Sequence, residues 1–144
     1  MTYKILLPVD GSEGSTNAAR HLAKMAGMVP NLAVEVHLAN IQPVGDDWMT
    51  RRSFKAEELA KMEQEWAEAA LAPAREILQA AGVTPIAHTR QGDVAPTIAR
   101  LAEELGCDQI TMGTRGLSTL GDLLMGSVAT KVLHLAKVPV TFVK

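Results

Sequence analysis

Four residues near the C-terminal end of the chain have the types and the spacing that suit a phosphate-binding loop. Gly113 and Gly116 are three residues apart, and after nine further residues Gly126 is followed by Ser127. Glycine has no Cβ, so backbone N–H groups at such positions can approach an anion closely. Ser127 also begins a helical pattern, and a helix N-terminus offers unpaired N–H groups. The pattern predicts an anion-binding loop over residues 113–127.

Asp10 is the second candidate for chemistry. It follows the apolar run of residues 4–9 and precedes Gly11-Ser12. A carboxylate at the end of a strand can coordinate Mg²⁺ or accept a ribose hydroxyl, and it can equally serve as a turn or cap residue. The glycine loop favours ligand contact, because the first and fourth strands are expected to be neighbours at the switch point of the sheet.

The elements that must position these residues alternate between short apolar runs and longer helical patterns, which is typical of βαβ units and a parallel sheet. Pro73 is expected to kink or divide the second helix, and Trp66 is expected in the core. Gln109 and Thr111 are polar residues that are expected to weaken the short fourth strand. Strands are predicted at residues 4–9, 33–41, 83–89, 109–112 and 138–143, and helices at residues 15–27, 55–81, from 93 and from 127.

The composition of the chain limits its class. The 144 residues carry 14 Lys and Arg against 16 Asp and Glu, with no basic block, which argues against a nucleic-acid or membrane-surface partner. No stretch approaches the roughly 20 apolar residues of a membrane span. The single cysteine cannot form an internal disulfide, and the four histidines lack metal-ligand spacing. One cytoplasmic domain over residues 1–144 is expected.

The glycine spacing resembles the ATP-binding signature of universal stress proteins. Residues 9–12 (Val-Asp-Gly-Ser), the pair Gly92-Asp93, residues 102–108 (Ala-Glu-Glu-Leu-Gly-Cys-Asp) and residues 138–140 (Val-Pro-Val) match the same family. The chain therefore resembles the ATP-binding subgroup over its whole length.

The resemblance implies a three-layer, Rossmann-like α/β sandwich with a five-stranded parallel sheet in the order 3-2-1-4-5. It also implies ATP as ligand, Mg²⁺ on Asp10, unidentified regulatory partners, and a homodimer that forms through the C-terminal edge strand with Val140 and Phe142 near the axis. The residues implied to contact the nucleotide are Pro8, Val9, Asp10, Ala39, Asn40, Ile41, Met112, Gly113, Arg115, Gly116, Gly126, Ser127 and Val128.

The function predicted is a nucleotide-dependent regulatory module in the stress response. The loop offers Asp122 alone as a carboxylate, no Walker-type sequence is present, and no catalytic residue is assigned. A slow ATPase or self-phosphorylating enzyme is the alternative. A flavodoxin-like reading of residues 12–16 lacks an aromatic side chain to stack on a flavin, and a receiver-domain reading lacks a phosphoacceptor aspartate after the third strand.

Overall fold

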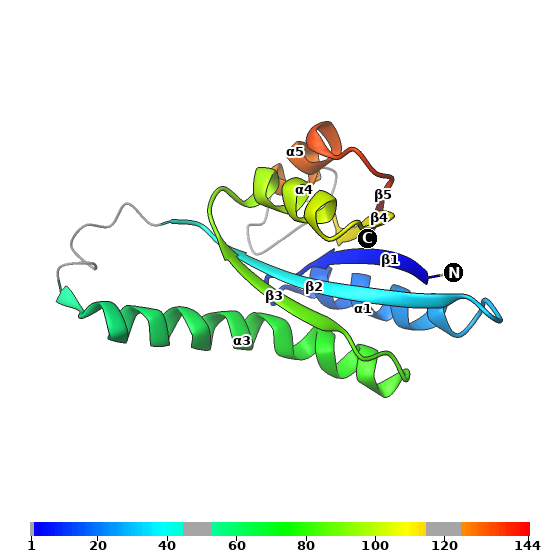
Figure 1. Cartoon of the computed structure of the whole chain (residues 1–144), viewed down its shortest axis with the longest axis horizontal. Coiled ribbons are helices and arrows are strands. Elements are labelled where there is room, and N and C mark those ends of the chain that lie inside the picture. Colours follow the sequence, from blue (N-terminus) through cyan, green and yellow to red (C-terminus); the bar gives the residue numbers. More distant parts are fainter. Residues whose placement is uncertain (1, 45–52, 115–124) are drawn as a thin grey trace.

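The computed structural model describes residues 2–44, 53–114 and 125–144. Five parallel strands form one sheet in the order β3-β2-β1-β4-β5, which confirms the predicted α/β fold class and strand order. Helices α1 and α3 cover one face of this sheet, and α4 and α5 cover the other (Figure 1). The bounds are β1 (Thr2–Pro8), α1 (Glu13–Ala26), β2 (Ala33–Gln42), α3 (Ala56–Ala80), β3 (Ile86–Gln91), α4 (Val94–Glu104), β4 (Gln109–Gly113), α5 (Ser127–Leu135) and β5 (Val140–Val143). Within these ranges, no helix is long and apolar enough to cross a membrane.

The central strand β1 is buried on both faces, as its continuous apolar sequence predicts. Ile5 and Leu7 belong to the core beneath α1 and α3, whereas Leu6 belongs to the core beneath α4 and α5. All three side chains are fully buried. Because successive side chains of a strand point to opposite faces, neighbouring residues of β1 contribute to two separate cores.

Strand β4 is not weakened by its polar residues, because their side chains bond to one another and to both neighbouring strands. Gln109 Nε2 donates to Thr111 Oγ1 at 2.8 Å and to Thr141 Oγ1 at 2.9 Å. Tyr3 Oη donates to Gln109 Oε1 at 3.1 Å. A satisfied buried polar row costs little and fixes register. These bonds tie β1, β4 and β5 together on the α1 side of the sheet.

Helix α3 departs from its predicted form at two residues. The helix is continuous through Pro73, so of the kink or division expected there the division does not occur. Trp66 was expected in the core but is 59% exposed. The buried residues of α3 are Ala67, Leu71, Ala74 and Leu78. The buried stripe therefore begins one position after Trp66 and consists of alanines and leucines.

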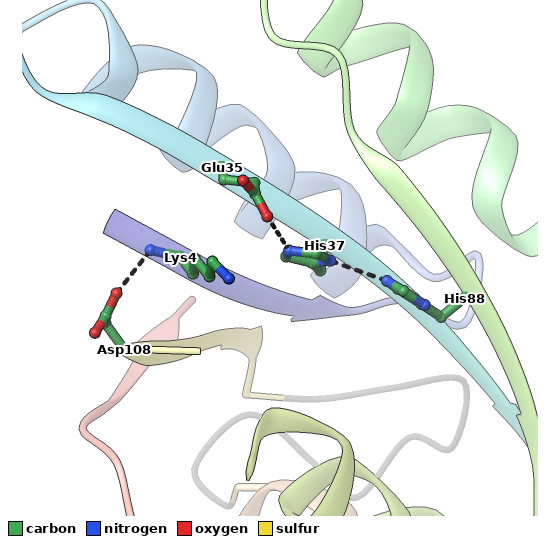
Figure 2. A network of polar contacts seen from close by, with 5 residues as sticks. All are labelled: Lys4, Glu35, His37, His88 and Asp108. Carbon is green, nitrogen blue, oxygen red and sulfur yellow. Dashed lines mark hydrogen bonds and ion pairs between the residues drawn. The ribbon is translucent and has the colours of Figure 1, made fainter. Parts of the chain in front are cut away.

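A row of hydrogen-bonded side chains links β2 to the edge strand β3 (Figure 2). His37 Nε2 lies 2.6 Å from Glu35 Oε1, and His37 Nδ1 lies 2.9 Å from His88 Nε2. Because the Glu35 carboxylate can only accept, neutral His37 carries its proton on Nε2 and accepts from His88 through Nδ1. Separately from this row, the backbone N–H of Lys4 on β1 donates to the Asp108 carboxylate at 2.9 Å. The two histidines are 51 residues apart, which is why sequence spacing did not connect them.

This row makes the stability of the sheet depend on pH. Burial lowers the pKa of His88, and electrostatic interaction with His37 and Arg90 lowers it further. A base whose pKa is lowered by folding binds fewer protons in the folded state, so stability is lost as pH falls through the ordinary histidine value of about 6.5.

We predict that the free energy of unfolding falls between about pH 7.5 and about pH 5.5, and that His88→Gln reduces this fall. Glutamine keeps an N–H donor for His37 but does not titrate. Urea denaturation at a series of pH values measures the effect, with exposed His21→Gln on α1 as the control. Equal pH dependence in the parent and in His88→Gln would contradict the assignment.

Candidate functional site

A cavity of about 300 Å³ lies at the carboxyl end of the sheet. Its walls come from the ends of β1, β2 and β4 and from the first turns of α1, α4 and α5. One wall is apolar and consists of Ala39, Ile41, Val94, Ile98, Met112 and Val128. This is the volume and the lining expected of a small-molecule site. Its position, outside the carboxyl ends of β1 and β4, is the switch point where open α/β sheets bind ligands.

The turn after β1 holds Asp10 at the cavity wall. Gly11 has φ of +82°, a conformation that favours glycine, and it turns the chain into α1. Asp10 Oδ1 accepts from Ser12 N at 2.9 Å and from Ser15 Oγ at 2.8 Å. Ser12 in turn caps α1 by accepting from Ser15 N at 3.3 Å. Asp10 is therefore a turn residue, as one of its two predicted roles requires, and it also lines the cavity.

Thr114 and Gly126, at the two ends of the glycine loop, are hydrogen-bonded to each other next to the cavity. Thr114 N donates to the Val143 carbonyl of β5 at 3.1 Å, and Gly126 N donates to the Thr114 carbonyl at 2.6 Å. Gly126 is the N-cap of α5, and no side chain of the described residues caps this helix. The first-turn N–H groups of a helix have no intrahelical partner. In α5 they belong to Ser127 and the two residues after it, all of which line the cavity.

Gly113 is required for a reason that the sequence did not reveal. A Cβ at this position would lie 2.7 Å from the backbone carbonyl of Gly14, at the start of α1. Close approach to an anion was the predicted reason for a glycine here. The structure shows a further reason: without a Cβ at Gly113, the backbone of Gly14 in α1 packs directly against the end of β4.

The structure brings most of the predicted contact residues together. Those that line the cavity are Pro8, Val9, Asp10, Ala39, Ile41, Met112, Gly113, Gly126, Ser127 and Val128. Asn40 lies between two of them but does not line the cavity, because its side chain donates to the Val9 carbonyl. Arg115 and Gly116 lie outside the described residues, as does Asp122.

Several lining residues were missed by sequence reasoning. Val94 and Ile98 are one helical turn apart at the start of α4, and their spacing indicated only that they face the sheet. Ser15 and Thr114 adjoin predicted site segments and could have been included for that reason. Ala129, in the first turn of α5, carried no signal of its own.

The residues that the structure describes contain neither a preformed cluster of metal-ligating side chains nor an activated thiol. They contain no group of three or more His, Cys, Asp or Glu side chains that could hold a metal ion. Cys107 precedes β4 at the opposite end from the cavity, and burial raises its pKa to about 11. At neutral pH this thiol is protonated and therefore a poor nucleophile.

The fold and the cavity define a class, the open parallel α/β proteins that bind small ligands at the switch point of the sheet. Within this class, a family model described as "Universal stress protein family" matches residues 1–144. The chain belongs to the universal stress protein family.

Individual relatives resemble the chain over nearly its full length. Universal stress protein MJ0531 of Methanocaldococcus jannaschii is 30% identical over 98% of this chain and 81% of that protein. Universal stress protein YxiE of Bacillus subtilis is 30% identical over 100% of both chains. The solved structure of hypothetical protein MJ0577 is 29% identical, with a TM-score of 0.79 over 98% of this chain and 94% of that one.

The contact between Gly113 and Gly14 predicts that Gly113→Ala destabilises the fold by about 1–3 kcal/mol, because a backbone atom must move to admit the methyl group. Gly27→Ala is the control, since its φ of −83° suits alanine and its nearest contact is 3.8 Å away. Its expected change is within about 1 kcal/mol. Chemical denaturation compares the two variants, and an unchanged stability of Gly113→Ala would contradict the close approach.

Proposed function

We propose that this universal stress protein binds ATP in the cavity and serves as a nucleotide-dependent regulatory module in the cytoplasm. The observation that carries the proposal is the pairing, in one cavity, of an apolar wall with the N-terminus of α5, which no side chain within residues 2–44, 53–114 or 125–144 caps. An adenine base fits the first of these and a phosphate chain fits the second.

The apolar wall suits a flat, weakly hydrated base. Ile41 and Met112 are buried side chains from β2 and β4, and Ile98 approaches from α4. Contact with such side chains removes the faces of a base from water, which is favourable. On this proposal, backbone groups at the end of β2 read the hydrogen-bonding edge of adenine.

The polar end suits phosphate. The partial positive charge of the α5 N-terminus stabilises an anion there, and the Ser127 hydroxyl adds a donor. The predicted contacts at Arg115 and Gly116 would extend this end of the site.

Two solved structures of the same fold hold adenine nucleotides. A universal stress protein in complex with cAMP is 24% identical to this chain with a TM-score of 0.66, and one from Archaeoglobus fulgidus in complex with dAMP is 23% identical with a TM-score of 0.67. Those ligands belong to those proteins. They support an adenine nucleotide as the ligand class to test first.

The hydrogen bonds of Asp10 favour ATP binding over ATP hydrolysis as the function. Asp10 is the only carboxylate among the described residues that line the cavity. Asp10 already accepts from Ser12 and Ser15, which hold it in the turn. The Asp10 carboxylate is therefore better suited to bind Mg²⁺ together with phosphate oxygens than to act as a general base that removes a proton from water. Slow ATP hydrolysis or self-phosphorylation is the second candidate.

We predict that Gly126→Val weakens ATP binding at least about tenfold, because a branched side chain at the N-cap obstructs the first-turn N–H groups of α5. Isothermal calorimetry with ATP measures the effect, and Gly27→Val at the far end of α1 is the control. ATP binding that is equally tight in Gly126→Val and the parent would refute the phosphate position. No ATP binding by the parent would refute the function.

Mg²⁺ should strengthen ATP binding to the parent more than to Asp10→Asn, because the carboxylate is proposed to share the ion with the phosphates. Without metal, Asp10→Asn should bind ATP at least as tightly as the parent, since a like charge has been removed. Calorimetry with and without Mg²⁺ provides both comparisons. An equal gain from Mg²⁺ in the two proteins would show that Asp10 does not hold the ion.

We further propose that two copies pair through β5, which is an edge strand of the sheet. All four residues of β5 are partly exposed, and the exposed Leu133 and Leu135 of α5 precede them. An uncovered apolar edge favours strand pairing, and an isologous dimer satisfies both edges at once.

Sedimentation at micromolar concentration should show a dimer, and Val140→Asp with Phe142→Lys should yield a folded monomer. Ile86→Asp on the opposite edge strand, where the side chain is 46% exposed, is the control that should remain dimeric. A parent protein that sediments as a monomer would overturn the pairing.

A further inference from the structure

Asn40 is a buried polar residue beside the cavity whose side chain does not enter it. It lies on β2 between Ala39 and Ile41, which line the cavity, and it is only 6% exposed. Alternation along the strand directs it to the opposite face, where its Nδ2 donates to the Val9 carbonyl at 3.0 Å.

Val9 is held by β2 through both of its backbone polar groups. Its N–H donates to the Ala39 carbonyl at 2.8 Å, and its carbonyl accepts from Asn40. Val9 lies one residue beyond the end of β1, so no regular strand pairing fixes its carbonyl. The peptide that joins Val9 to Asp10 is therefore held on both sides: Asn40 donates to its carbonyl, and its N–H donates to Ser15 Oγ at 3.0 Å.

Gln42 fixes the orientation of the Asn40 amide. Gln42 Nε2 donates to Asn40 Oδ1 at 3.3 Å and to the Glu63 carbonyl of α3 at 2.8 Å. With its oxygen engaged in this way, Asn40 presents its NH₂ group to Val9. The row from Glu63 through Gln42 and Asn40 to Val9 connects α3 to the cavity wall without a gap.

We propose that Asn40 is a positioning residue for the ligand site and that Gln42 keeps Asn40 in place. The Asp10 carboxylate is held from α1 by Ser12 and Ser15, while its preceding peptide is held from β2 by Asn40. Both restraints are needed to aim Asp10 at the cavity. The effect on nucleotide binding rests on the function proposed above, whereas the effect on the Val9–Asp10 backbone does not.

The first test is a double-mutant cycle for binding of ATP with Mg²⁺. Asn40→Ala should weaken binding about tenfold in the parent and less than about twofold in an Asp10→Asn background, because the group that Asn40 positions is then already altered. Ile5→Val, a buried truncation in the middle of β1 at a residue that does not line the cavity, controls for lost stability and should leave affinity unchanged. Equal losses in both backgrounds, or no loss, would overturn the proposal.

The second test needs no nucleotide. Hydrogen exchange of the ligand-free protein should show faster exchange at residues 9–12 in Asn40→Ala, with protection at residues 3–7 of β1 retained. Gln42→Ala should show the same change in exchange to a smaller extent. This variant replaces Asn40→Ala in the test if Asn40→Ala folds poorly. Unchanged exchange at residues 9–12 would overturn the positioning role. If the parent binds no ATP while these residues lose protection, the proposed function fails and the positioning role stands.

Discussion

The carboxyl end of β1 is the constraint on which the rest of the structure depends. This strand is followed by α1 and by β2 on one side, whereas its neighbour β4 is followed by α5 and by β5 on the other, so the chain leaves the two strands in opposite directions. Helices that follow parallel strands with right-handed crossovers then cover opposite faces, and a hollow remains where the two directions part. The cavity is a geometric result of the strand order, and local sequence decides only what lines it.

Glycine and polar side chains shape that hollow. Gly113 allows the backbone of α1 at Gly14 to approach β4, and Gly11 turns the chain away from β1. Asp10 is then held from two directions, by serines of α1 and through the Asn40 bond to Val9. The site wall is thus built from backbone that is fixed before any ligand arrives, which reduces the entropic cost of binding.

Local patterns in the sequence predicted the fold well because parallel strands buried on both faces are continuous apolar runs. The strand order itself came from the resemblance to a family. The prediction was wrong in details that tertiary contacts determine. Trp66 lies outside the core because the buried stripe of α3 consists of Ala67, Leu71, Ala74 and Leu78. The third strand begins later than residue 83, and the fifth begins after Pro139.

The candidate site was predictable to the extent that it consists of backbone near glycines and strand ends. Its remaining features depend on contacts between distant segments. The fit of Gly113 against Gly14, the bond of Asn40 to Val9 and the pair of His37 with His88 join residues far apart in the chain. One sequence alone does not reveal such pairs.

The most direct test of the account is to follow backbone amide resonances of the protein while ATP is added. The account predicts that the largest shifts occur at the cavity wall, at Val9, Ile41, Gly113 and the first turn of α5. Shifts confined to another surface, such as the groove lined by Gln64 and Arg75 of α3 and by Thr89 of β3, would contradict it. An absence of shifts at millimolar ATP would contradict it as well.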